Sequence, residues 1–386
     1  MIKKTIQKIL FFYLVIITNA SALIEIDITE GNREPLPIAV TNFFYAEDAI
    51  KDLDQISIDV SKVISADLER SGLFKSIDQE AFIQKTASMH IRPRHEDWRL
   101  INAQALVTGE LEIDKDKLRV EFRLWDTFAE KEIEALVLIT TIDNWRRISH
   151  MIADKIYERL TGEEGYFDTR ILYVSENGPK NNRIKKLAIM DQDSFNHRYL
   201  TSGKELVLTP RFNPVKQEIT YLSYFKNLPR VYLLDIQTGI QEVVGDFPGM
   251  TFAPRFSPDG EKIIMSLARD GNSDIYVMDI KSRVVERLTD SPAIDTSPSY
   301  SPDGKKITFN SDRGGSQQIY VMDNKGRNQT RISRGTGNYA TPVWSPRGDL
   351  IAFTKNFQGR YFIGVMRTDG TGERLLTENW YQEAPS

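Results

Sequence analysis

The pattern of hydrophobic and polar positions changes near residue 170. Before that point, apolar residues recur at both strand and helix spacings, whereas beyond it only short apolar runs remain, separated by turns rich in Gly, Pro and Asp. Spacings of three and four residues indicate amphipathic helices, and alternation or short continuous runs indicate strands. The pattern therefore predicts an α/β region followed by an all-β region.

Two helices are expected in the first region. The first has a helical stripe made of Ile56, Val60, Val63, Ile64 and Leu68. The second has a similar stripe made of Trp145, Ile148, Ile152, Ile156 and Leu160. Gly72 and Gly162 follow these stripes at positions where glycine commonly ends a helix, and Asp143 is the expected N-cap of the second helix.

Several strands accompany the helices. The segment LIEIDIT, residues 23–29, alternates apolar and polar residues and predicts a strand with one apolar face, and PLPIAVTNF is a second short run. Three longer strands are expected at Ala105–Ile113, Leu118–Trp125 and Ile133–Thr140. We therefore expect an α/β domain over residues 23–165, with a mixed sheet and two helices.

The second region is a series of repeats. One set of prolines recurs every 44 residues, at Pro210, Pro254, Pro298 and Pro342. A set of aspartates keeps the same interval, at Asp191, Asp235, Asp279 and Asp323. Each unit contains, in order, a short strand, a turn such as Pro-Asp-Gly, and three further strands. The proline, aspartate and glycine match the preferences of successive turn positions.

The third strand of each unit decides the architecture. In IYVMD, residues 319–323, every position except the last is apolar, whereas a sheet wetted on one face would alternate. Both faces of each four-stranded sheet must therefore be covered by neighbours until a ring closes. Repeats of about 44 residues with four strands each predict a β-propeller over residues 166–386.

The repeat count is about five. Ala384, Pro385 and Ser386 match the start of another unit, because Pro385 follows Pro342 by 43 residues. We therefore expect about five blades, either as a five-bladed propeller or as a propeller truncated at its C-terminal end, and the ending inside a repeat favours truncation.

The first 22 residues differ from the rest. Lys3, Lys4 and Lys8 precede an apolar run from Ile9 to Ile17, and small residues stand at positions 20–22. Nine helical residues rise roughly 14 Å, about half of a bilayer's hydrocarbon thickness. This layout predicts a cleavable signal peptide, with cleavage after Ala22, export of the mature protein and no direct membrane insertion.

Composition excludes several function classes. The chain has 50 Lys and Arg against 54 Asp and Glu, a formal net charge of −4, and no cysteine. There is no basic surplus for nucleic acid, no thiolate chemistry, and neither an HExxH nor a GxSxG sequence. We therefore expect no enzyme activity, no catalytic residues, no metal site, no cofactor and no nucleic-acid binding.

Three loops that precede the repeat prolines are the candidates for recognition. They are Phe247–Ala253, Ser291–Ser297 and Gly335–Thr341, here called the mouth loops. Equivalent loops emerge at one end of a propeller, where clustered loops on a rigid scaffold commonly bind a partner, although plain connections are the alternative. The arginines that recur through the repeats, among them Arg255, Arg287 and Arg313, are expected to be mostly solvated or paired locally.

The sequence resembles the TolB family of the Tol-Pal system. The resemblance rests on the apparent signal peptide, the α/β domain, the repeats A-P-x-[FYW]-S-P-D-G followed by I-Y-V-M-D, and the start I-x-I-x-x-G at Ile26, Ile28 and Gly31. It implies a six-bladed propeller in the family and a periplasmic adaptor, without enzyme activity, that supports outer-membrane integrity and cell division.

The resemblance also implies partners. The propeller face would bind the lipoprotein Pal and the mature N-terminal segment would bind TolA, with other outer-membrane lipoproteins or porins as further candidates. The Pal-facing positions would be Met250, Phe252, Ala253, Asp295, Thr296, Tyr339 and Thr341. The TolA segment would comprise Leu23, Ile24, Glu25, Ile26, Asp27, Ile28 and Thr29.

Two other functions compete with an adaptor. One is an exported peptidase-type propeller protein that lacks its catalytic domain, because such enzymes share the Pro-Asp-Gly repeats. The other is a propeller that binds peptidoglycan or sugar through an aromatic-lined opening. Retention of a lipoprotein, turnover of peptide esters and retention of glycan would distinguish the three.

Overall fold

The chain divides into two compact units, Met1–Thr169 and Arg170–Ser386. The computed structural model describes residues 24–26, 34–46, 52–84, 92–225, 228–245, 247, 250–269 and 271–379. Within those ranges, no helix is both long enough and apolar enough to cross a bilayer. The predicted signal peptide, residues 1–22, lies outside them.

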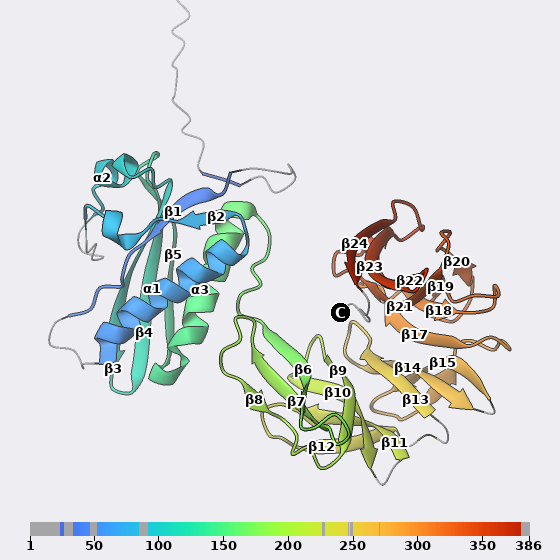
Figure 1. The fold of residues 1–386 in the computed structure, drawn as a ribbon. Coiled ribbons are helices and arrows are strands. Elements are labelled where there is room, and N and C mark those ends of the chain that lie inside the picture. Colours follow the sequence, from blue (N-terminus) through green and yellow to red (C-terminus); the bar gives the residue numbers. More distant parts are fainter. Residues whose placement is uncertain are drawn as a thin grey trace, which may run out of the picture. The chain divides into compact units, whose positions relative to one another are not determined.

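The first unit is built on a mixed five-stranded sheet of order β2-β1-β3-β4-β5 (Figure 1). Its strands are β1 (Leu36–Val40), β2 (Phe74–Ser76), β3 (Ala105–Asp114), β4 (Lys117–Asp126) and β5 (Lys131–Thr141). β1 pairs in parallel with β2 and β3, and the remaining pairs are antiparallel. The three long strands predicted from the sequence are confirmed.

Two helices pack against each other and against this sheet. They are α1 (Asp52–Arg70) and α3 (Trp145–Thr161), and their apolar stripes lie in one core with the sheet. Ile64, Leu68 and Ile156 have no exposed surface. Gly162 follows α3 with φ of 73°, a left-handed conformation that glycine adopts without strain, so both predicted helices and this helix end are confirmed.

Two details of the first unit differ from the prediction. Asp143 belongs to a short 3-10 turn, η2 (Ile142–Asn144), and Asn144 stands at the N-cap of α3 without a side-chain cap bond, so the predicted cap is wrong. A short helix, α2 (His95–Leu100), and a 3-10 turn, η1 (Gln79–Ala81), were not predicted. Six and three residues are too few to show a helical stripe.

The second unit consists of five sheets, which follow one another around an arc in chain order (Figure 1). The first contains β6 (Arg170–Asn177), β7 (Ile184–Asp191) and β8 (Arg198–Tyr199). The second contains β9 (Leu206–Phe212), β10 (Glu218–Phe225), β11 (Leu228–Asp235) and β12 (Gln241–Gly245). The third contains β13 (Met250–Phe256), β14 (Lys262–Arg269), β15 (Asn272–Asp279) and β16 (Val285–Arg287).

The last two sheets repeat the same plan. The fourth contains β17 (Asp295–Tyr300), β18 (Lys306–Ser311), β19 (Gln318–Asp323) and β20 (Thr330–Arg331). The fifth contains β21 (Asn338–Trp344), β22 (Leu350–Phe357), β23 (Arg360–Arg367) and β24 (Arg374–Asn379). These sheets are five blades of a β-propeller, as the repeats predicted.

Apolar clusters fill the spaces between consecutive blades. On β15, Ile275 and Val277 face the fourth blade, while Tyr276 and Met278 face the second. Alternate residues of one strand thus enter opposite interfaces, which is why all four residues from Ile275 to Met278 are apolar. Burial of each such side chain contributes about 1.5 to 3 kcal/mol, so the contacts between blades stabilise the whole array.

The blades depart from the expected closed ring of four-stranded units. Four apolar clusters join the five blades in sequence, and no cluster of described residues joins the fifth to the first. The first blade has three strands instead of four. Phe167, just before β6, is fully buried in the core of the first unit, so this part of the chain does not supply a further strand.

The turn after the first strand of a blade is held by its own side chains. Ser301 Oγ donates to Asp303 Oδ1 at 2.6 Å and accepts from the Lys306 N–H at 2.9 Å. Gly304 has φ of 67°, which favours glycine at that position. Ser257 and Ser345 make the corresponding bonds in the neighbouring blades.

Candidate partner-binding site at the mouth loops

The mouth loops lead into the first strands of three consecutive blades, β13, β17 and β21. Asp295 and Thr296 begin β17. On β21, Tyr339 lies at the place of Asp295, whereas Thr341 lies at the place of Ser297. The repeat of 44 residues thus places Asp295 and Tyr339 at equivalent positions. Met250, Phe252 and Ala253 lie on β13, and the structure does not describe their side chains.

A bulge bends each of these first strands. The residue before the repeat proline has a left-handed backbone, with φ of 55° at Ser297 and 47° at Thr341, and Thr209 of the second blade has the same conformation. The pairing register shifts at the bulge, between Thr296 and Ser299 in the fourth blade. A left-handed β-branched residue is rare and strained, so the bulge is a specified feature of the repeat.

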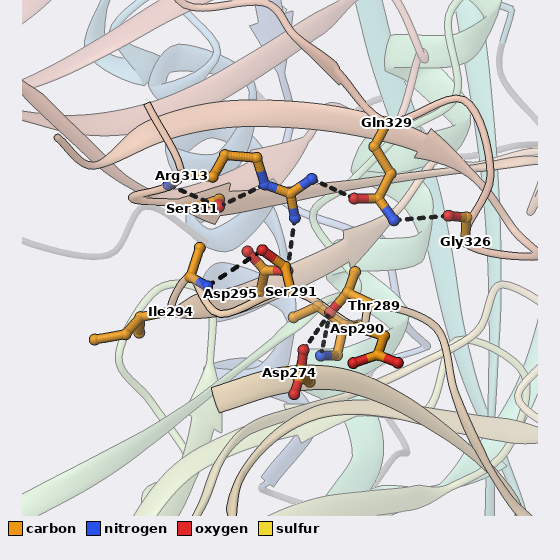
Figure 2. A network of polar contacts seen from close by, with 12 residues as sticks. Asp274, Thr289, Asp290, Ser291, Ile294, Asp295, Ser311, Arg313, Gly326 and Gln329 are labelled. Atoms are coloured by element: carbon orange, nitrogen blue, oxygen red, sulfur yellow. Dashed lines mark hydrogen bonds and ion pairs between the residues drawn. The ribbon is translucent and has the colours of Figure 1, made fainter. Parts of the chain in front are cut away.

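An ionic network fixes the mouth loop of the fourth blade. Asp295 has no exposed surface, and its Oδ2 accepts a hydrogen bond from Arg313 Nη2 at 2.7 Å. Arg313 Nε donates to Ser311 Oγ at 2.9 Å, and Arg313 also donates to Gln329 (Figure 2). The guanidinium carbon lies 5.4 and 5.0 Å from the ring centroids of Phe309 and Tyr320.

This network makes Asp295 part of the support beneath the loop. A buried carboxylate requires a charged partner, and here the partner comes from the turn that follows β18. In the same loop, the Ile294 N–H donates to Asp312 Oδ1 at 2.8 Å, so a second carboxylate also orders the loop. Contacts from within the blade thus order this loop.

The fifth blade uses different residues at the same places. Tyr339 has no exposed surface, and its hydroxyl donates to Glu373, with Oε2 at 2.8 Å. Lys355 Nζ lies 2.7 Å from Glu373 Oε1 and 4.7 Å from the Tyr339 ring centroid. Burial raises the pKa of the Tyr339 hydroxyl, so Tyr339 stays protonated and donates at neutral pH.

Two of the predicted residues retain exposed surface. Thr296 and Thr341 are both partly exposed, and Thr341 Oγ1 shares a hydrogen bond of 2.8 Å with Thr354 Oγ1. These threonines lie beside supports formed by Asp295 and Tyr339. The arrangement presents small polar side chains on rigid strands, which suits recognition of another protein without an induced rearrangement.

The supporting residues were only partly foreseen. Arg313 was expected to be solvated or paired locally, and it is paired with Asp295; Arg287 likewise lies 2.6 Å from Asp274 Oδ2. Lys355 and Glu373 were not singled out. The alignment of the repeats could have identified Glu373, because it occupies the position that Gln329 holds in the fourth blade.

The described part of the predicted TolA segment lies against the first unit. The Ile26 N–H donates to the Leu160 carbonyl at 2.6 Å, and the Ile24 N–H donates to Asp126 Oδ2 at 3.0 Å. Ile26 is buried and Glu25 is exposed, as the alternating pattern predicted, although these residues are not part of a strand. Leu23, Asp27, Ile28 and Thr29 lie outside the described residues.

Family models match both units of the chain. The model of the TolB amino-terminal domain matches residues 24–133, and that of the TolB beta propeller domain matches residues 157–386. The second match alone covers more than half of the chain.

Curated relatives and a crystal structure agree with these matches. The "Tol-Pal system protein TolB" of Pelagibacter ubique (strain HTCC1062) is 64% identical over 254 residues, which are 64% of this chain and 57% of that protein. The protein of that name from Paramagnetospirillum magneticum is 58% identical over 234 residues, 60% of this chain and 52% of its own. These matches thus span little more than half the length of the curated relatives.

The TolB crystal structure from Acinetobacter baumannii has a TM-score of 0.80 against this chain. It is 30% identical, and the match covers 92% of this chain and 85% of that chain. The arrangement of an α/β domain before a propeller is therefore common to both.

Proposed function

Because the chain belongs to the TolB family, we propose that it is a periplasmic adaptor of the Tol-Pal system without enzyme activity. The mouth loops would bind the lipoprotein Pal, and the segment 23–29 would bind TolA. Through these contacts the protein would support outer-membrane integrity and cell division.

One observation carries the proposed Pal site. The mouth loops of the fourth and fifth blades are fixed from beneath by separate ionic clusters, around Asp295 and around Glu373. The partly exposed threonines Thr296 and Thr341 lie in these loops, at neighbouring positions of the repeat. Preorganised loops lose little conformational entropy on binding, which favours a protein partner of defined shape.

A different observation supports the proposed TolA segment. Ile24 and Ile26 pack against the first unit's core, and the backbone of each donates one hydrogen bond to it. Since the contact is short and not part of a sheet, the segment could leave the domain at modest cost. An extended segment with alternating apolar residues can then add to the edge of a partner's sheet.

Deletion of residues 23–29 tests the two sites separately. The deleted protein and the protein that begins at residue 23 would be titrated with the soluble domains of Pal and of TolA. The proposal predicts that deletion abolishes TolA binding and leaves Pal binding unchanged. Unchanged TolA binding would refute the role of the segment, and absence of Pal binding by both proteins would refute the role of the mouth loops.

A further inference from the structure

The innermost strands end in an unusual set of residues, at the end of the blades away from the mouth loops. The next-to-last residues of β9 and β13 are Arg211 and Arg255, and the equivalent residues of β17 and β21 are Ser299 and Val343. All four line one cavity of about 460 Å³ that is formed by four consecutive blades. This volume lies in the range of small-molecule sites.

The cavity has one cationic side and one neutral side. Arg211 and Arg255 are its only charged lining residues, and no carboxylate is among the described residues that line it. The final residues of the same four strands are aromatic, namely Phe212, Phe256, Tyr300 and Trp344, and all of them line the cavity. The cavity thus combines two guanidinium groups with apolar walls.

Neither arginine has a carboxylate partner within the described residues. Arg255 Nε is buried and has no hydrogen-bond acceptor. Among the described residues, none forms a hydrogen bond or an ion pair with the Arg255 side chain. Arg211 has one such bond, from Nη1 to the carbonyl of its neighbour Pro210 at 3.0 Å. This contrasts with Arg313, whose guanidinium is fully engaged at the other end of the blades.

Arg211 and Arg255 are both partly withdrawn from water, where an unpaired guanidinium is unfavourable, and here two of them lie together. Burial and the nearby charge of Arg211 lower the pKa of Arg255 to about 9, so both groups remain protonated at neutral pH. Buried charges in proteins are normally paired or bound to an ion. A bound anion would remove this cost.

None of the described hydroxyl groups that line the cavity is hydrogen-bonded to Arg211 or Arg255. Ser257 and Ser301 line the cavity, but their Oγ atoms are hydrogen-bonded within the turns that follow the first strands. A hydroxyl is in any case neutral and cannot compensate two positive charges. The missing partner therefore carries negative charge.

We infer that this cavity is a binding site for a carboxylate group attached to an apolar body, held by Arg211 and Arg255. Guanidinium groups match the planar geometry of a carboxylate and can bind it through two parallel hydrogen bonds. The aromatic residues would cover the apolar part of the ligand. This site is separate from the proposed Pal and TolA sites and does not depend on them.

The carboxylate could belong to a free organic acid or to the C-terminus of a peptide. Both sources share the chemistry that the cavity recognises. An inorganic phosphate would satisfy the arginines but would leave the aromatic walls uncovered and would lose more hydration, so it should bind more weakly.

Calorimetric titration of the whole chain with four probes tests the inference. The probes are 3-phenylpropionate, its neutral amide, the peptide acetyl-Ala-Ala-Phe with a free C-terminus, and inorganic phosphate. We expect at least one carboxylate probe to bind, and the amide and phosphate to bind at least about tenfold more weakly, since a hydrogen bond to a charged group is being lost. The better carboxylate probe identifies the source.

Variants locate the binding. Arg255→Gln and Arg211→Gln should each weaken the carboxylate by about tenfold or more, whereas Arg183→Gln, which changes an exposed arginine paired with Glu176, should leave it unchanged. The thermal midpoint offers a readout that needs no ligand. Arg255→Met should raise it, because the substitution replaces a partly buried, unpaired charge with an apolar side chain.

Several results would overturn the inference. One is that the amide or phosphate binds as tightly as the carboxylate probes. A second is that the three glutamine variants bind the carboxylate with equal affinity. A third is that neither carboxylate probe binds the unsubstituted protein. A lower thermal midpoint for Arg255→Met would also count against it, because it would mean that Arg255 already has a stabilising partner.

Discussion

Arg313 Nη2 lies 2.7 Å from Oδ2 of Asp295, a residue without exposed surface. Removal of one partner of a buried ion pair costs about 3 to 5 kcal/mol, because the remaining charge stays buried and unpaired. We expect Arg313→Met to lower the free energy of unfolding by that amount in denaturant titrations.

The double variant Asp295→Val/Arg313→Met should recover most of this loss, since Val207 fills the equivalent position in the second blade. Arg283→Met is the matched control, because Arg283 pairs with Glu242 on the surface, where an ion pair contributes about 0 to 1 kcal/mol. A loss of similar size in the control and in Arg313→Met would contradict the assigned role of the pair.

The contact between Ile26 and Leu160 predicts local protection of the N-terminal segment. Because the Ile26 N–H donates to the Leu160 carbonyl at 2.6 Å and its side chain is buried, this amide should exchange slowly with solvent hydrogen. Ile26→Lys places a charge in the core and should expel the segment, so that protection is lost. Glu25→Lys, at an exposed position, should retain it, and equal exchange in the two variants would show that the segment is not docked.

Two glycines of the fourth blade should respond differently to alanine. Gly304 and Gly326 both have positive φ, at 67° and 78°. A Cβ at Gly304 would meet only Pro258 atoms at 3.9 Å, so Gly304→Ala should cost only the conformational penalty of about 1 to 2 kcal/mol.

A Cβ at Gly326 would overlap the carbonyl oxygen of Leu288 in the neighbouring blade, so Gly326→Ala should cost clearly more. Denaturant titration of both variants makes the comparison. The contact between blades would be refuted by equal losses of stability.

Asp154 should make the stability of the first unit depend on pH. Its carboxylate accepts hydrogen bonds from the backbone N–H groups of Phe167 and Asp168, at 2.6 and 2.9 Å, but burial still raises its pKa above 3.8. The folded protein therefore holds this proton more tightly than the unfolded chain does.

This contribution to stability is present below pH 3.8 and is lost as the pH rises through the raised pKa. Asp154→Asn cannot lose the proton, so its unfolding free energy should vary less with pH across that window. Thermal melts of both proteins from pH 3.5 to 7 measure the difference. Parallel curves would mean that Asp154 titrates normally.

The repeats explain why so much of the second unit could be predicted. The blades share apolar strands and related turns, with Pro-Asp-Gly in the third and fourth blades and Pro-Arg-Gly in the fifth, so an error at one position is corrected by its equivalents in the other blades. In contrast, α2 and η1 of the first unit occur once and are short, so no periodic sequence pattern predicts them.

The predicted site illustrates what sequence alone leaves open. Thr296 and Asp295 are neighbours in one loop, yet Thr296 is partly exposed and Asp295 is buried. The difference depends on Arg313, which reaches Asp295 from the turn after another strand. Arg255 shows the reverse case, because an arginine expected to be solvated or paired has no partner among the described residues.

The most direct test of the proposed function is a calorimetric titration with the soluble domain of Pal, comparing two arginine substitutions in the fourth blade. Thr296→Arg changes the mouth loop, whereas Thr330→Arg changes the exposed outermost strand β20 of the same blade. We predict that the unsubstituted protein, beginning at residue 23, binds Pal. Thr296→Arg should weaken this binding by at least about tenfold, because the larger side chain conflicts sterically with Pal at the loop. Thr330→Arg should leave the affinity for Pal unchanged. Equal affinities for all three proteins, or no binding by any, would contradict the proposed function.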